Sequence, residues 1–280
     1  MSEIENIAKQ MVAKGKGILA ADESTGTMTK RLSSVNVEST SENRLKFRET
    51  LFSAEGMKNY IGGVILYDET IKQKTSSGKT IPELIKSFGS IPGIKVDTGA
   101  KKLAGSSEEK VTEGLDGLRE RLEEYYKLGA RFTKWRAVYN ISKKYPSELA
   151  VKANAHALAR YAALVQEAKM VPIVEPEVLM DGEHNIMKCY EVTSNVLKEC
   201  YKELKLHNVN LKGTILKPNM ILPGSKSKDK SNSTEIAKLT LKCLKENVPN
   251  EVPGIAFLSG GQTEIEATQN LNEINKINDT

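Results

Sequence analysis

The chain has 280 residues, of which 39% are hydrophobic and 28% are charged, values typical of an ordinary globular protein. It contains no run of about 18 apolar residues, so no transmembrane helix is predicted, and the acidic residues in its first segment argue against a signal or transit peptide. The net charge of +5 comes from basic residues scattered along the chain, which favours anionic small molecules over a nucleic-acid groove.

The predicted elements alternate between helices and strands along the chain. The first segment is predicted to be a helix because Ile4, Ile7, Met11 and Val12 recur at helical spacing. Short apolar runs rich in β-branched residues then indicate strands, in the order GILAADES, GGVILYDET, GIKVDTG, FTKWRAV, VPIVEPE, GTILKPN and IAFLSGG. Each run ends in a polar residue before a turn, namely Asp22, Asp68, Lys95, Lys134, Glu175, Lys217 and Ser259.

Segments with helical periodicity lie between the later strand runs. One has Leu115, Leu118 and Leu122 on one face and Gly129 as its stop. Two others begin at Ser147 and Ser233, which are typical first residues of helices, and a further helix is predicted over 263–278. The spacing between the last strand ends is about 40 residues, which is typical of one β/α unit each.

The fold class follows from strands that are apolar throughout. Such strands are buried on both faces, as in a parallel sheet covered by helices. An open doubly wound sheet and a TIM (β/α)₈ barrel both satisfy this pattern, but a barrel collects functional residues from many strand ends, as seen here. We therefore predict a single TIM-barrel domain over residues 1–280, with seven β/α units visible and the eighth strand absent.

The polar residues at the strand ends suggest covalent chemistry. Because residues i and i+2 of a strand share a face, Lys134 lies with Arg136 and Glu175 with Glu177, and Lys217 joins them if it points inward. A lysine becomes a nucleophile when desolvation or a neighbouring cation disfavours its ammonium form, which permits a Schiff base. Two carboxylates offer a proton shuttle and a group that holds the lysine.

Two further interpretations concern anions and metal ions. The remaining cations suit phosphate, and the two glycines of SGGQTEIEA precede a helix start, where backbone N–H groups can hold an anion. The histidines, His156, His184 and His207, are too far apart to indicate a metal site, and the cysteines, Cys189, Cys200 and Cys243, have no C-x-x-C spacing. We therefore predict no metal, no cofactor, no disulfide and a cytoplasmic location. Purely structural ion pairs remain an alternative for the charged strand ends.

Long motifs spread over the chain carry a family resemblance. KGILAADESTGTMTKRL, IGGVILYDET, GIKVDTG, KWRAV, PIVEPE, ILKPNM and FLSGGQTEIEA resemble, in order, segments of class I fructose-1,6-bisphosphate aldolase, a metal-independent glycolytic enzyme that works through a Schiff base. The resemblance implies that Lys217 forms the Schiff base with the C2 carbonyl of the substrate and that Glu175 is the general acid/base. Glu177 and Lys134 would position and tune Lys217, and Asp22 would accept the C4 hydroxyl proton.

The same resemblance assigns the phosphate sites and the partners. The C6-phosphate end would be bound or lined by Lys95, Arg136, Ser24, Thr27, Lys30 and Arg31. The C1 phosphate would be bound by Ser259, Gly260 and Gly261. The implied partners are sugar phosphates, further copies of the chain in a homotetramer, and actin, with no nucleic acid and no membrane span.

Departures from the family pattern raise an alternative. Lys212 stands where family members usually have Glu, at the start of the Lys217 strand. The family's eighth strand, with its Ser-Tyr-Gly-Arg segment, and its carboxyl-terminal tyrosine have no counterpart. We therefore expect a truncated aldolase, and the alternative is a catalytically impaired fragment or an aldolase-like binding protein, for example toward actin.

Overall fold

The structure is a computed structural model of the chain that describes residues 1–278. It divides into two units: unit 1 is Met1–Val96, Gly117–Lys134 and Leu164–Pro172, and unit 2 is Asp97–Asp116, Trp135–Ala163 and Ile173–Thr280. Two long strands, β6 (Phe132–Tyr139) and β7 (Val171–Val178), run from unit 1 into unit 2. The prediction of one domain over the whole chain stays a prediction.

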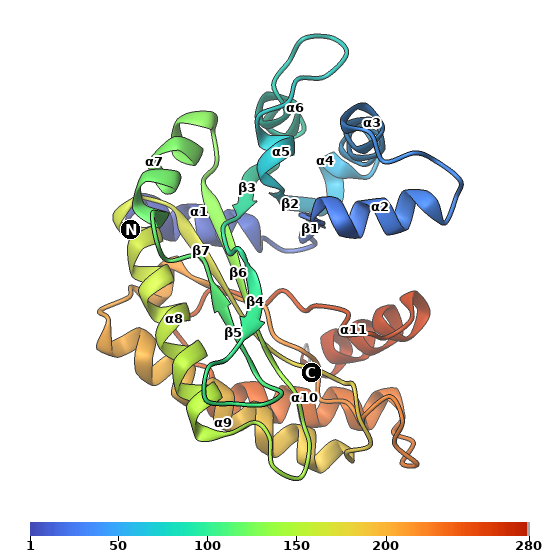
Figure 1. Cartoon of the computed structure of the whole chain (residues 1–280), viewed down its shortest axis with the longest axis vertical. Coiled ribbons are helices and arrows are strands. Elements are labelled where there is room, and N and C mark those ends of the chain that lie inside the picture. The colour runs from blue at the N-terminus through green and yellow to red at the C-terminus, as the bar shows by residue number, and fades with distance from the viewer. Residues whose placement is uncertain (279–280) are drawn as a thin grey trace. The chain divides into compact units, whose positions relative to one another are not determined.

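Unit 1 is built on parallel strands in the order β1, β2, β3 and the start of β6. The first three are β1 (Gly17–Ala21), β2 (Ile61–Leu66) and β3 (Ile91–Lys95). Its helices are α1 (Glu3–Met11), α2 (Thr25–Ser33), α3 (Ser41–Phe52), α4 (Met57–Tyr60), α5 (Asp68–Ile71), α6 (Ile81–Ser87) and α7 (Leu118–Leu128). Figure 1 shows α5 and α6 close to β3, against which both pack.

The sequence explains how tightly this sheet is packed. The apolar run of β2 is almost wholly buried, as expected of a strand covered on both faces. Glycine is required at Gly93, because a Cβ there would come within 2.3 Å of the Phe132 ring of β6. Gly129 ends α7 at a φ of +111°, in the left-handed region that favours glycine, as its predicted role as a stop requires.

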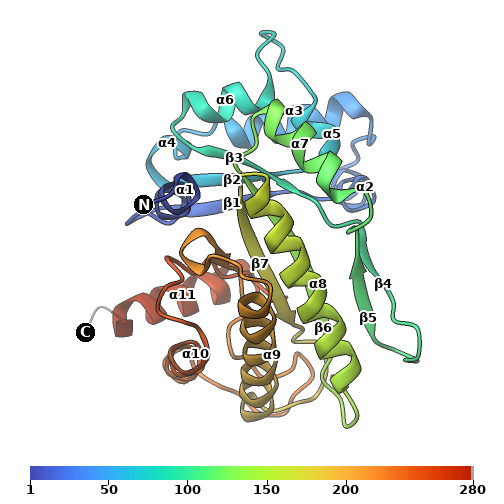
Figure 2. The same ribbon diagram turned by 90° about the vertical axis from the view of Figure 1, so that its left-hand side faces the viewer.

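Unit 2 contains the rest of β6 and β7, followed by β8 (Ile215–Leu216), which pairs with β7 in parallel. A separate antiparallel pair is formed by β4 (Gly99–Lys102) and β5 (Lys110–Glu113). The helices are most of α8 (Glu148–Glu167), then α9 (Ile186–Leu206), the short 3₁₀ helix η1 (Leu211–Gly213), α10 (Ser233–Asn247) and α11 (Glu264–Asn278). In Figure 2, α10 lies beside both α9 and α11, with which it packs.

The predicted seventh strand is present only as a short extension of the sheet. Ile255 forms a single parallel bridge with Leu216, and the Leu258 N–H donates to the Pro218 carbonyl at 3.2 Å. The prediction of a full strand is wrong in extent, because Pro218 has no N–H to continue the ladder beyond β8. The order of all seven apolar runs along the sheet still agrees with the sequence.

Smaller corrections concern helix ends and the surface. The helix α10 begins at Ser233 as predicted, and Asn232 caps it, since the Asn232 side chain accepts the Glu235 N–H at 2.9 Å. Leu115 lies before α7 begins, although Leu118 and Leu122 are buried as predicted.

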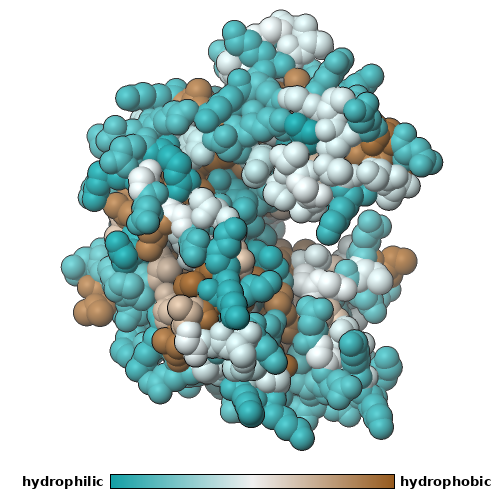
Figure 3. Space-filling model, in the orientation of Figure 1, coloured by the Kyte–Doolittle hydropathy of each residue, from teal (hydrophilic) through white to brown (hydrophobic). Residues whose placement is uncertain are grey.

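The face in Figure 3 is mostly hydrophilic, with hydrophobic residues in small patches. Within residues 1–278, no helix has the length and apolar character needed to cross a bilayer.

Candidate active site

Lys217 lies directly after β8 and forms a buried ion pair. Its N–H donates to the Val174 carbonyl at 2.8 Å, which continues the β7–β8 ladder by one residue. Since Ile173 pairs with Ile215 and Val174 with Leu216, the register brings Glu175 opposite Lys217. The Lys217 Nζ atom lies 2.8 Å from Glu175 Oε1, and the two side chains are 12% and 3% exposed. An amine and a carboxylate are thus held together with little access to water.

Asn219 connects the segment after Lys217 to the end of β7. Its Oδ1 accepts the Val178 N–H at 3.0 Å, and its Nδ2 donates to Thr193 Oγ1 of α9 at 3.2 Å. The side chain is buried, so both contacts form away from water. Sequence reasoning missed this positioning residue, although it lies in the KPNM motif, because a buried asparagine gives no periodic signal.

Glu177, the second carboxylate of β7, contacts Arg136 of β6 rather than a lysine. The Arg136 Nε donates to Glu177 Oε2 in a very short hydrogen bond. Burial lowers the pKa of the Arg136 guanidinium, but the hydrogen bond to Glu177 and the charges of Glu177, Glu175 and Asp97 together outweigh it, and the net pKa is raised. The Asp97 carboxylate accepts the Arg136 backbone N–H at 3.3 Å, which fixes this part of β6.

Unit 1 contains a second buried lysine–carboxylate pair. Lys134 Nζ lies 2.9 Å from Asp22 Oδ2, and the side chains are 7% and 13% exposed. Asp22 directly follows β1, as predicted from the sequence, whereas Lys134 lies within β6. Lys95, the last residue of β3, is the register partner of Lys134, so the two lysines leave the sheet on the same face. The pair and the neighbouring cation suit an anionic ligand.

The loop after β1 leads into α2, where the remaining predicted phosphate residues lie. Ser24 caps the helix, since its hydroxyl accepts the Thr27 N–H at 3.3 Å. Arg31 reaches back to Glu23 at 2.7 Å. Lys30 and Arg31 are exposed in the last turn of α2, so this helix presents a capped amino terminus and a basic carboxyl-terminal end.

The loop of Ser259, Gly260 and Gly261 forms a tight turn. The Gln262 N–H donates to the Ser259 carbonyl at 3.2 Å, and the glycines have φ angles of +62° and +88°. Within residues 1–278, neither glycine N–H makes a hydrogen bond. Thr263 and Glu266 cap the amino terminus of α11, since the Glu266 carboxylate accepts the Thr263 N–H at 2.9 Å. The glycine N–H groups are available to an anion at this loop.

Comparison with known proteins shows the family and the fold of the chain. A solved structure of fructose-bisphosphate aldolase from Plasmodium falciparum, in complex with TRAP and a small-molecule inhibitor, matches 98% of this chain and 80% of its own with a TM-score of 0.97 and 46% identity. The fold is therefore that of an aldolase TIM barrel, and the predicted fold class is confirmed. The family model "Fructose-bisphosphate aldolase class-I" matches residues 3–280. The chain belongs to the class-I fructose-bisphosphate aldolase family.

Curated relatives are similar over nearly the whole chain. The "Probable fructose-bisphosphate aldolase class 1" of Xylella fastidiosa is 53% identical over 99% of this chain and 83% of its own length. The cytosolic fructose-bisphosphate aldolase 4 of Arabidopsis thaliana is 56% identical over 94% of this chain and 67% of its own length. These names favour the aldolase and do not favour the alternative of a non-catalytic binding protein.

Proposed function

We propose that Lys217 is the residue that forms a Schiff base with the C2 carbonyl of fructose 1,6-bisphosphate. The observation that carries this proposal is the buried Lys217–Glu175 pair at 2.8 Å. Attack of the Lys217 amine on the carbonyl gives a carbinolamine, which must lose water to give the iminium. The iminium then withdraws electrons from C3 as the C3–C4 bond breaks.

Glu175 is the proposed acid/base for the dehydration step. Its carboxylate touches the Lys217 amine, so it can take a proton from the ammonium and deliver one to the departing hydroxyl of the carbinolamine. Glu177 has a supporting role in this proposal: it holds Arg136, whose own position is fixed by Asp97. Lys134 is proposed to tune the site as a second cation, a role that rests on the family resemblance.

Asp22 is the proposed base for carbon–carbon cleavage. It would take the proton from the C4 hydroxyl while the C3–C4 electrons move toward the iminium, which releases glyceraldehyde 3-phosphate and leaves an enamine on Lys217. Protonation of that enamine at C3 and hydrolysis of the iminium release dihydroxyacetone phosphate and restore the free lysine. The buried ion pair with Lys134 supports this role, because it holds the Asp22 carboxylate in place after β1.

The proposed phosphate-binding residues form two groups, one for each phosphate of the substrate. For the C6 phosphate we propose Lys95, Arg136, Ser24, Thr27, Lys30 and Arg31. For the C1 phosphate we propose Ser259, Gly260 and Gly261, because the glycine N–H groups make no other hydrogen bond within residues 1–278. A cytoplasmic location, a homotetramer and actin binding are proposed from the family resemblance, and the cytosolic names of the Arabidopsis relatives support the location.

The test compares two lysines at the start and the end of one segment. Lys217→Met removes the amine, whereas Lys212→Met changes an exposed lysine just before β8 and serves as the matched control. We expect Lys217→Met to lose more turnover than a single proton-transfer group supplies, which is roughly 10²–10⁴-fold. Lys212→Met should keep near-normal cleavage of fructose 1,6-bisphosphate. Substantial turnover from folded Lys217→Met would move the nucleophile elsewhere.

A further inference from the structure

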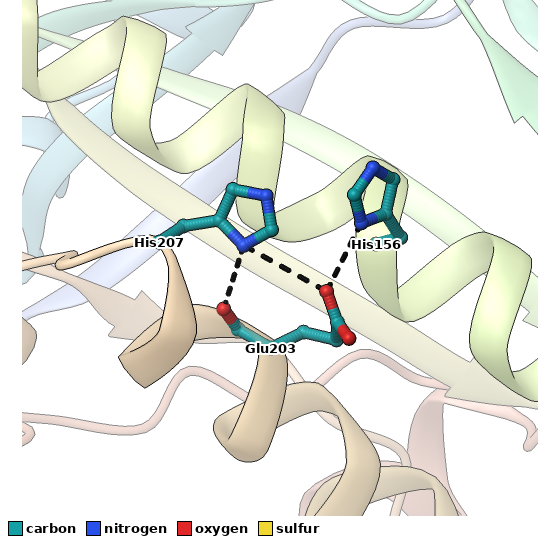
Figure 4. Close-up of side chains that lie close together, drawn as sticks. All are labelled: His156, Glu203 and His207. Carbon is teal, nitrogen blue, oxygen red and sulfur yellow. Dashed lines mark hydrogen bonds and ion pairs between the residues drawn. The ribbon is translucent and has the colours of Figure 1, made fainter.

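Two histidines from different helices meet at one glutamate in unit 2. His156 lies on α8, and Glu203 and His207 lie at the end of α9. The His156 Nδ1 is 3.1 Å from Glu203 Oε2, and the His207 Nδ1 is 3.7 Å from the same oxygen. The two imidazole rings are 5.0 Å apart between centroids, and Figure 4 shows both close to the Glu203 side chain.

This cluster was not visible in the sequence. His156 and His207 are far apart in the sequence, but contacts of α8 with the end of α9 bring them together. Only Glu203 and His207 have a recognisable spacing, one helical turn apart. The third ligand comes from another helix, so no motif search along the chain finds it.

We propose that His156, Glu203 and His207 form a binding site for a divalent transition-metal ion such as Zn²⁺. One ligand atom from each residue lies within 4.8 Å of the others. A zinc ion about 2.0–2.2 Å from each atom needs ligand atoms roughly 3–4 Å apart, so small side-chain rotations suffice. Two imidazoles, one carboxylate and a water molecule complete a tetrahedral site.

The donor set selects the kind of metal ion. Imidazole nitrogen suits zinc, copper and nickel, whereas calcium and magnesium prefer sites made of oxygen atoms. The His207 Nδ1 is 2.9 Å from the Glu203 backbone carbonyl. Because a metal ion needs an imidazole nitrogen with a free lone pair, His207 would bind through Nε2 if its Nδ1–H donates to that carbonyl, and through Nδ1 if the ring turns away from it.

The neighbouring lysine and cysteine side chains do not compete with a metal ion for these three residues. Lys202 and Lys152, which lie close in sequence to Glu203 and His156, pair with Glu199 and Glu148. Cys200 lies one turn before Glu203, but it is fully buried, and burial raises the pKa of its thiol to about 12. The thiol is therefore no competing ligand. A bound ion would link α8 to the end of α9 and stabilise unit 2, separately from the Schiff-base chemistry.

The test is a zinc titration of untagged protein that has been freed of metal. Isothermal titration calorimetry with zinc chloride should show one saturable site per chain, and Co²⁺ should give the visible absorption of a tetrahedral complex. His156→Gln changes a side chain that is 53% exposed, so it should keep the fold and weaken zinc binding by at least about tenfold. His207→Gln should do the same.

His184 offers the matched control, because it is the remaining histidine of the chain and, among residues 1–278, belongs to no such cluster. His184→Gln should leave the zinc affinity unchanged within about twofold. Circular dichroism checks that each variant is folded. The absence of a saturable site in the unaltered chain, undiminished binding by folded His156→Gln, or an equal loss in His184→Gln would each overturn the proposal.

Discussion

Two lysine–carboxylate pairs, Lys217–Glu175 and Lys134–Asp22, have nearly the same geometry but different settings. Their nitrogen–oxygen distances are 2.8 and 2.9 Å, and all four side chains are largely buried. Lys217 lies just past the two-residue strand β8 and before a proline, whereas Lys134 lies within the eight-residue strand β6. Burial and ion pairing alone therefore do not distinguish a nucleophile from a supporting cation.

The carboxylates that pair with the two lysines also differ in how the fold holds them. Glu175 faces Lys217 from the adjacent strand and is fixed by the sheet register, while Asp22 reaches Lys134 from the segment after β1. In the proposed mechanism the first pair forms and dehydrates the carbinolamine, and the second supplies a base and a cation. Variants that remove one member of each pair in turn test whether the two pairs have different roles.

After Lys217→Met, the largest effect is expected for Glu175→Gln. The amide keeps the shape and some hydrogen bonding of the carboxylate but transfers no proton, so turnover should fall by roughly 10²–10⁴-fold with the fold retained. Glu177→Gln is the matched control on the same strand face, and its loss should be smaller because Glu177 contacts Arg136. Steady-state kinetics of both variants show which one loses more turnover. A larger loss in Glu177→Gln would assign the proton shuttle to that residue.

Lys134→Met should mainly reduce stability. It removes the ammonium beside the buried Asp22 carboxylate, and breaking a buried pair costs up to about 3–5 kcal/mol. The double variant Lys134→Met/Asp22→Asn also removes the carboxylate charge and should recover part of this loss. Urea unfolding measures the free energy of unfolding of the single and the double variant. If the double variant is no more stable than Lys134→Met, the pair does not dominate the energetics of this site.

Asn219→Ala should have a smaller effect. It leaves the buried Val178 N–H without its acceptor, which costs about 1–3 kcal/mol. Because Asn219 fixes the segment after Lys217, turnover should fall more than affinity for the substrate. Thr193→Val removes only the second contact and should be milder. Equal stability and turnover in both variants would show that the Val178 contact has no positioning role.

The smallest effect is expected for chelation. Cleavage activity should be unchanged in EDTA, because the proposed chemistry uses an amine and carboxylates at strand ends and the proposed metal site lies on α8 and α9. The assay is turnover before and after dialysis against the chelator. Loss of activity that zinc or cobalt restores would contradict the Schiff-base account.

Much of the candidate site was predictable because polar residues interrupt or follow apolar runs. This pattern singled out Lys217, Glu175 and Asp22 as candidate site residues before the family resemblance was considered, although Glu175 lies within β7 and not at its end. The sequence could not tell which glutamate faces Lys217, since Glu175 and Glu177 share a strand face and the register with β8 decides between them. The histidine cluster also depends on a contact between distant segments, whereas β4 and β5 lie close in sequence but contain too few apolar residues to indicate strands.

The central claim, that Lys217 and not Lys134 is the Schiff-base lysine, is tested most directly by covalent trapping. Borohydride in the presence of dihydroxyacetone phosphate reduces a Schiff base to a stable adduct, which peptide mass spectrometry can locate. The adduct should be on Lys217 in the unaltered chain, remain in folded Lys134→Met and disappear in Lys217→Met. An adduct on Lys134 or another lysine, or one that persists in Lys217→Met, would contradict the account.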